Sequence, residues 1–112
     1  MPHDPMEIIQ GTLEMLILKA LVRGSCNGWQ VLCWLRERAG GELSIEEGAL
    51  YPALHRLERK RLVSSEWGLS ENNRRARFYT LSERGRSELL RQSTDWSRYV
   101  RVVAGILGEA IA

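Results

Sequence analysis

The side chains best suited to a chemical role are two clusters of cations in the second half of the chain. They are Arg56, Arg59, Lys60, Arg61, Arg74, Arg75 and Arg77. Cations gathered on one part of a small domain bind polyanions, most often the phosphates of nucleic acid. On charge alone, a solvated basic face with no ligand is an equally good interpretation.

The basic excess is confined to one half of the chain. Residues 1–55 contain four Lys or Arg and seven acids, a net charge of −3, whereas residues 56–112 contain twelve and seven, a net charge of +5. The overall charge of +2 therefore hides a strongly asymmetric distribution. This asymmetry favours the second half as the part that meets a polyanion.

The sequence gives little support for a catalytic site, a disulfide framework or a metal site. No nucleophile stands at a recognisable spacing from a base, and no glycine-rich loop could cradle a phosphate. Cys26 and Cys33 are too few for a disulfide framework, and no Cys or His pair has the spacing of a zinc site. We therefore expect no enzyme activity, no cofactor and no metal, and a structural role for both cysteines.

The composition is that of one ordinary globular domain. The chain has 112 residues, of which 44% are hydrophobic and 27% charged, enough to bury a single core. No apolar run approaches the ~18 residues of a membrane span, and the N-terminus lacks the layout of a signal peptide. We expect a cytoplasmic protein without membrane contact.

Apolar periodicity predicts two helices in the first forty residues, after a loose arm at residues 1–7. The first follows a stripe from Ile9 to Leu21. Asn27 can cap the second, which Gly40-Gly41 ends with a left-handed backbone. Its buried face is expected to contain Trp29, Val31, Leu32, Leu35 and Ala39.

The stretch EEGALYPALHRLERKRL, residues 46–62, predicts a third helix with an unusual beginning, after a very short strand at residues 42–44. Gly48 and Pro52 lie in its opening turns, although glycine costs about 1 kcal/mol inside a helix and proline about 3. Proline is tolerated only near a helix start, so the helix should begin within residues 44–48. Gly48 would let a large, rigid partner approach closely.

After this helix the apolar period changes from 3.6 to 2. The pattern predicts strands at residues 62–67 and 76–81, and the polar residues 68–75 between them form the basic tip of a hairpin.

Ser82 can cap a last helix that runs nearly to Ala112. This order predicts a mostly α (α+β) winged helix-turn-helix, with a DNA-binding domain at residues 8–82 and a dimerisation helix at 83–112.

GALYPALHRLE, followed by LVSSEW and RRARFYTLSERGR, resembles the PadR-like transcriptional regulators over residues 10 to about 87. The short chain resembles the compact branch with a single C-terminal dimerisation helix. The resemblance implies a sequence-specific DNA-binding repressor. Two positions depart from the family pattern: Ala49 replaces a common Thr, and Arg61 replaces a Gly whose left-handed conformation is awkward for Arg.

The third helix and the hairpin supply the residues expected to bind DNA, the helix in the major groove and the hairpin on phosphates or in the minor groove. Tyr51 could instead be half-buried against the hairpin, His55 an ordinary surface residue, and the hairpin arginines simply solvated. The expected DNA-binding residues are Glu47, Gly48, Ala49, Tyr51, Pro52, His55, Arg56, Arg74, Arg75 and Arg77.

The last helix has an apolar seven-residue repeat that predicts a twofold dimer on a pseudo-palindromic operator. The seam is Leu89, Ser93, Trp96, Val100, Val103, Leu107 and Ala110, widened by Leu90, Ile106 and Ile111.

The resemblance also implies that an aromatic residue at the dimer interface can stack on a flat ligand. Trp96, with Trp34 nearby, is therefore a candidate pocket for a small aromatic effector, although plain interface packing explains Trp96 more simply. The alternative to a DNA-binding regulator is a winged-helix module that binds proteins and has no operator.

Overall fold

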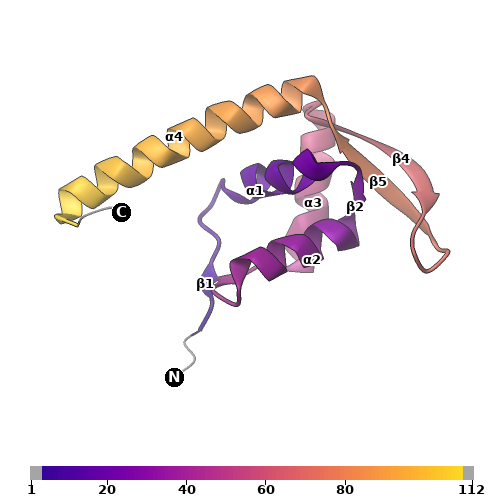
Figure 1. Cartoon of the computed structure of the whole chain (residues 1–112), viewed down its shortest axis with the longest axis horizontal. Coiled ribbons are helices and arrows are strands. Elements are labelled where there is room, and N and C mark those ends of the chain that lie inside the picture. The colour runs from indigo at the N-terminus through magenta and orange to yellow at the C-terminus, as the bar shows by residue number, and fades with distance from the viewer. Residues whose placement is uncertain (1–3, 110–112) are drawn as a thin grey trace.

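The computed structural model describes residues 4–109, which fold into four helices and five short strands (Figure 1). A single 3₁₀ turn, Leu21–Arg23, follows the first helix. The helices are α1 (Leu13–Ala20), α2 (Gly28–Ala39), α3 (Glu47–Arg59) and α4 (Glu83–Leu107). The strands are β1 (Met6–Glu7), β2 (Cys26–Asn27), β3 (Leu43–Ser44), β4 (Val63–Leu69) and β5 (Arg75–Leu81).

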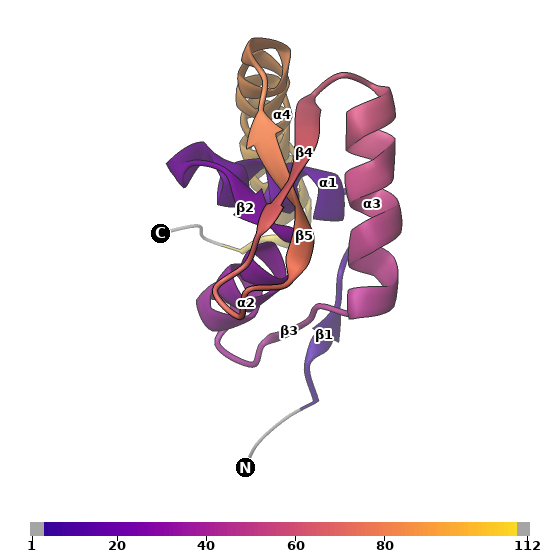
Figure 2. The ribbon, with the colours of Figure 1, turned by 90° about the vertical axis from the view of Figure 1, so that its right-hand side faces the viewer.

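The strands form two sheets. β1 pairs in parallel with β3, while β2, β5 and β4 form an antiparallel sheet in that order. β4 and β5 are the hairpin of a winged helix-turn-helix, and α3, the reader helix, stands along one side of it (Figure 2). The predicted fold class is confirmed.

The core lies where the apolar faces of α1, α2 and α3 meet. Helical spacing places apolar side chains on one face of each helix, and those faces are buried against one another. The largest fully buried side chains are Ile17, Leu18, Leu21, Val31, Leu32, Leu50, Leu54 and Leu57.

The predicted helix caps are confirmed. Asn27 accepts a hydrogen bond from the Gln30 backbone while the Gln30 side chain accepts one from the Asn27 backbone, a complete capping box. Gly40 ends α2 in the left-handed conformation, and Ser82 accepts a hydrogen bond from the Gly85 backbone at the start of α4. These contacts set where α2 and α4 begin.

The N-terminal segment differs from the prediction. The first helix begins at Leu13 rather than Ile9, because Gly11 has a φ of 92° and breaks the stripe; Ile9 is 61% exposed. Part of the expected loose arm is β1; residues 1–3 lie outside the described residues.

Trp29 is also not buried as predicted. It is 58% exposed, while its neighbour Gly28 is buried. In the first turn of α2 the Tyr51 ring of α3 lies where a side chain at Gly28 would begin, so a glycine occupies the inner side. Trp29 is left on the surface.

The hairpin and the last helix have different ends from those expected. β4 continues to Leu69 and β5 begins at Arg75, so the turn between them is shorter than predicted; Asn73 in this turn has a φ of 61°.

α4 ends at Leu107, where Gly108 takes the left-handed conformation. Ala110 and Ile111, expected to continue the seam, lie outside the described residues.

α4 is packed against α1, and its C-terminal half extends away from the rest of the chain (Figure 1). Within residues 4–109, none of the helices is long and apolar enough to cross a membrane.

Candidate nucleic-acid interface

The first half of the reader helix presents an exposed surface. Its apolar residues face the core, and the other face contains Glu47, Gly48, Ala49, Pro52 and His55, all exposed. A side chain added at Gly48 would meet nothing within 4 Å. The surface at Gly48 is therefore open, as expected for a point where a rigid partner approaches. The helix begins at Glu47, within the predicted range, and continues through Pro52.

Tyr51 lies between the reader helix and the beginning of α2. Its ring is half-buried and covers Gly28. Burial first, and then the nearby Glu47 carboxylate, raise the pKa of Tyr51 above its ordinary value. The hydroxyl therefore stays protonated at neutral pH and can donate a hydrogen bond. Tyr51 is thus half-buried, as in the alternative interpretation, and it lines the same groove as the hairpin residues while its ring contacts the start of α2.

On the hairpin, two arginines bracket an exposed indole. The guanidinium carbons of Arg75 and Arg77 lie 4.7 and 5.4 Å from the ring centre of Trp67. Trp67, 56% exposed, is paired with Arg77 across the hairpin. As expected of alternate strand residues, the two arginines share a face.

Arg77 has a second partner on the reader helix. Its guanidinium lies 3.5 Å from the Glu58 carboxylate, which also accepts a hydrogen bond from the Ser65 hydroxyl. Nearby, burial and then the Glu58 charge raise the pKa of Tyr79. Glu58 thus ties the hairpin to the reader helix. Arg77 is partly neutralised inside the molecule, whereas Arg75 has no ion pair among residues 4–109.

A groove of about 480 Å³ lies between the reader helix, the start of α2 and the hairpin. It brings together five of the residues predicted to bind DNA. They are Tyr51, His55, Arg74, Arg75 and Arg77. The groove has cations on the hairpin side and hydrogen-bond donors on the helix side, which suits a phosphate backbone.

Two exposed indoles, Trp29 and Trp67, also line this groove, together with Asn72 at the hairpin tip. The sequence interpretation did not include these three among the DNA-binding residues. Helical periodicity favoured a buried Trp29, and alternation gave no reason to distinguish Trp67 from any other strand aromatic. Only the fold shows that the start of α2 and the hairpin face the same space.

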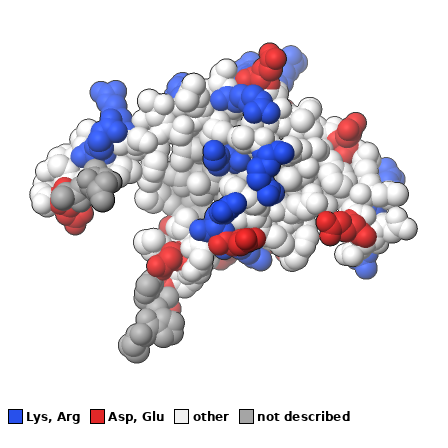
Figure 3. All heavy atoms as spheres, viewed as in Figure 1, with Lys and Arg blue, Asp and Glu red and all other residues white. Residues whose placement is uncertain are grey.

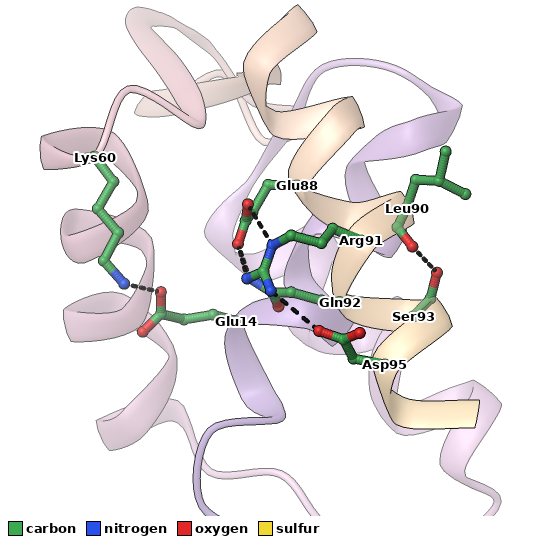
Figure 4. A network of polar contacts seen from close by, with 8 residues as sticks. All are labelled: Glu14, Lys60, Glu88, Leu90, Arg91, Gln92, Ser93 and Asp95. Atoms are coloured by element: carbon green, nitrogen blue, oxygen red, sulfur yellow. Dashed lines mark hydrogen bonds and ion pairs between the residues drawn. The ribbon is translucent and has the colours of Figure 1, made fainter. Parts of the chain in front are cut away.

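Arg56 does not line this groove but points toward α1. Its Nε donates to Glu14 of α1 at 3.0 Å, and the Lys60 Nζ donates to the same carboxylate at 2.9 Å. Figure 4 shows the Glu14–Lys60 pair beside α4. Burial alone would raise the pKa of Glu14, but hydrogen bonds from Lys60 and Arg56 outweigh it and leave the pKa below its ordinary value. Any contact of Arg56 with DNA would compete with this ion pair.

A second charged network lies along α4. Arg91 donates to Glu88 and Asp95, one turn away on either side (Figure 4). Hydrogen bonds from Arg91 and then Gln92 lower the pKa of Glu88 to about 2. The network supports the helix locally.

The predicted seam is only partly covered within one chain. Leu89, Ser93, Trp96, Val100 and Val103 are half-buried, whereas Leu107 is 65% exposed. Large apolar side chains beside the seam are also exposed. They are Leu90, Tyr99, Val102 and Ile106, with 69%, 61%, 54% and 80% of their surface accessible.

Trp34 and Trp96 do not share a cavity within the described part of the chain. Trp34 lies on α2 between Arg23 and Arg38, whose guanidinium carbons are 5.2 and 5.0 Å from its ring centre. Trp96 lies on α4, stacked on Tyr99 with ring centres 6.2 Å apart. In a single chain, only Trp96 borders the hollow between α1 and α4.

Among residues 4–109, no group of His, Cys, Asp and Glu could hold a metal ion. Cys26 is buried and Cys33 exposed, and neither forms a disulfide.

Comparison with known proteins identifies relatives of the whole fold. The family described as "Transcriptional regulator PadR-like family" matches residues 17–91. A transcriptional regulator from Clostridium thermocellum is 25% identical with a TM-score of 0.79, over 87% of this chain and 94% of that one. A PadR family regulator from Clostridium difficile R20291 is 28% identical with a TM-score of 0.72, over 87% and 98%. Another from Eggerthella lenta is 28% identical with a TM-score of 0.75, over 88% and 83%.

Proposed function

Because the chain belongs to the PadR-like family of transcriptional regulators, which are DNA-binding proteins and not enzymes, we propose that it is a dimeric repressor released from its operator by a small aromatic effector. Repression is the role that the family resemblance implies. The remaining parts of the proposal rest on the geometry of the reader helix, the hairpin and α4.

The first half of α3 enters the major groove in this proposal. Gly48 adds no bulk where the helix meets the DNA backbone, and Glu47, Ala49 and Pro52 lie on the same exposed surface. The protonated hydroxyl of Tyr51 donates to a phosphate, and His55 reaches a base edge or the backbone. Base contacts from this surface determine which operator is bound.

The hairpin holds the backbone beside the reader helix. Arg74 and Arg75 are exposed and have no ion pair among the described residues, so their charge is available to phosphates. Arg77 is half-buried and forms an ion pair with Glu58. It therefore stabilises the position of the hairpin and binds a phosphate more weakly than Arg74 or Arg75. Arg56 is held by Glu14 and must leave this ion pair to contact DNA.

A second copy of the chain covers α4. The exposed apolar side chains along its length, including Ile106 and Leu107, exceed what a monomer of this size can bury. A twofold dimer would place two reader helices about one DNA turn apart, which requires a pseudo-palindromic operator. An effector stacked on Trp96 would sit beside this interface.

The observation that carries the proposal is the groove in which Tyr51, His55 and the hairpin arginines face one space. It is tested by measuring binding to duplex DNA from the gene's own upstream region and to an unrelated duplex, at several salt concentrations. A regulator binds its operator selectively, and its affinity falls by roughly 10³–10⁵ between 50 and 200 mM salt if 6–10 phosphates are contacted. Tyr51→Ala and Arg75→Ala should each weaken this binding.

The competing function is a winged-helix module that binds protein partners. It predicts weak binding that is equal for both duplexes and insensitive to Tyr51→Ala. That outcome would refute the repressor proposal.

A further inference from the structure

The two exposed indoles in the groove between the reader helix, the start of α2 and the hairpin have different surroundings. Trp29 and Trp67 are similarly exposed, and both line the groove. Two arginines of β5 lie over the ring of Trp67, whereas no cation among residues 4–109 lies over the ring of Trp29. Trp67 is therefore the indole that has a charged partner.

The register of the hairpin explains why both arginines reach this ring. Trp67 is paired with Arg77, and Arg75 is the next residue on the same face of β5. Diagonal neighbours across an antiparallel pair lie within reach of long and aromatic side chains. The nearer guanidinium carbon is that of Arg75, at 4.7 Å from the ring centre.

The contact with the ring leaves the hydrogen-bonding capacity of Arg75 unused. A guanidinium has five N–H donors, and its attraction to an aromatic ring requires no N–H···O bond. Arg77, in contrast, also forms an ion pair with Glu58. Arg75 has no ion pair among the described residues, so it is held by Trp67 and keeps its donors for an oxygen of another molecule.

Positive charge alone does not distinguish Arg75 from other cations. Lys and Arg side chains also gather over α1 and α2 on the face shown in Figure 3. Arg74, the neighbour of Arg75 in the same groove, is exposed and has no aromatic ring beside it in the described structure. A side chain that is already ordered avoids an entropic cost on binding, which corresponds to about two- to tenfold in affinity.

We propose that Trp67 is a positioning residue for DNA binding. It holds the Arg75 side chain over its ring in the free protein, so that the guanidinium meets a phosphate of the operator without first being ordered. The inference rests on the proposed function and deepens it, because it names the residue that prepares the hairpin's phosphate ligand.

Three single variants test this role by titration of the upstream duplex. Trp67→Leu removes the aromatic ring at an exposed position, so it should keep the wild-type urea midpoint and weaken binding about two- to tenfold. Trp67→Phe keeps an aromatic face and should lose less affinity. Trp29→Leu is the matched control at an exposed indole without a cation, and any loss that it causes should be the same in the Arg75→Gln background.

A double variant separates positioning from direct contact with DNA. In the Arg75→Gln background, Trp67→Leu should weaken binding by less than about twofold, because the side chain to be positioned is absent and Glu58 still holds Arg77. Additive losses would mean that Trp67 itself touches the DNA, and they would overturn the proposal. Wild-type affinity of the single Trp67→Leu variant would overturn it as well.

NMR of the protein without DNA distinguishes this inference from the proposed function. The ring current of Trp67 should shift the Arg75 Nε–H proton upfield, and Trp67→Leu should abolish the shift while the Arg23 and Arg38 signals, beside Trp34, stay unchanged. Operator binding without this upfield shift would defeat the positioning role alone. Absence of operator binding with the shift present would defeat the repressor proposal, and with it the role of Trp67 in DNA binding.

Discussion

The ring of Tyr51 occupies the space in which a side chain at Gly28 would begin. A Cβ placed on Gly28 would lie 2.8 Å from the Tyr51 Cζ and 2.9 Å from its hydroxyl oxygen. The Tyr51 ring can occupy this position only because residue 28 has no side chain. The position of the proposed phosphate donor therefore depends on a glycine in another helix.

Gly28→Ala should displace Tyr51, destabilise the fold by about 1–3 kcal/mol through overpacking, and weaken operator binding. Gly48→Ala is the matched control, because its new methyl group meets nothing within 4 Å. It should leave stability unchanged or raise it by up to about 1 kcal/mol, yet still weaken DNA binding. Urea unfolding and duplex titration give the two readouts. A stable Gly28→Ala protein with normal DNA affinity would contradict this account.

The two hairpin arginines should behave differently in a salt titration. Arg75→Gln removes a free charge, so the slope of log affinity against log salt should fall by about one per protomer. Arg77→Gln loses the Glu58 ion pair as well, so it should lower the unfolding free energy by up to about 1 kcal/mol and change the slope less. If Arg77→Gln produces the larger change in slope, Glu58 does not restrain Arg77 as the structure indicates.

Glu14→Gln should destabilise the protein in a pH-dependent way. The pKa of Glu14 is lower in the folded state, so its contribution is complete above the unfolded value of about 4.3 and is lost as pH falls through the folded value. At pH 7 the variant should lose about 1 kcal/mol, and the difference from wild type should shrink below about pH 4.3.

Urea unfolding at several pH values measures this difference. Glu66→Gln, at an exposed acid with no ion pair among the described residues, is the control and should lose nothing. A deficit in Glu14→Gln that stays constant down to pH 3.5 would rule out the ion pairs with Arg56 and Lys60 as its cause.

Ile106→Glu should dissociate the proposed dimer without unfolding the chain. Ile106 is 80% exposed in one chain, so a charge there has little effect on the protomer but would be buried by a partner. We expect the dimer dissociation constant to rise at least about tenfold, seen by light scattering during size-exclusion chromatography. Thr94→Glu, exposed on α4 outside the apolar stripe, should leave the mass unchanged. A wild-type monomer at micromolar concentration would refute the dimer.

Much of the fold could be predicted because its signals are local. Asn27, Gly40 and Ser82 act on neighbouring backbone groups, so their caps are visible in a few residues of sequence. Arg61 is singled out by the family resemblance, which predicts either strain or a different cap; its φ of 62° shows that it adopts the left-handed conformation.

The features that sequence analysis missed depend on residues far apart in the chain. β1 and β2 have two residues each, too few to show any periodicity, whereas the short strand predicted at residues 42–44 is present as β3. Glu14 and Arg56 are separated by 42 positions, so no spacing rule connects them. The inner position at the start of α2 is occupied by Gly28 against the Tyr51 ring, a contact between two helices that the sequence of α2 alone does not show.

α4 lies on α1 through its N-terminal half, and its C-terminal half extends beyond that contact. The part of α4 beyond Trp96, which ends at Leu107, spans roughly 16 Å at 1.5 Å per residue. A rotation of about 5° where α4 lies on α1 therefore moves the far end by roughly 1.4 Å. If a partner chain fixes that far end, the same rotation instead swings the whole DNA-reading part of each protomer. A small change in the angle of α4 beside Trp96 would then change the distance between the two reader helices. That distance would no longer match one turn of the DNA duplex.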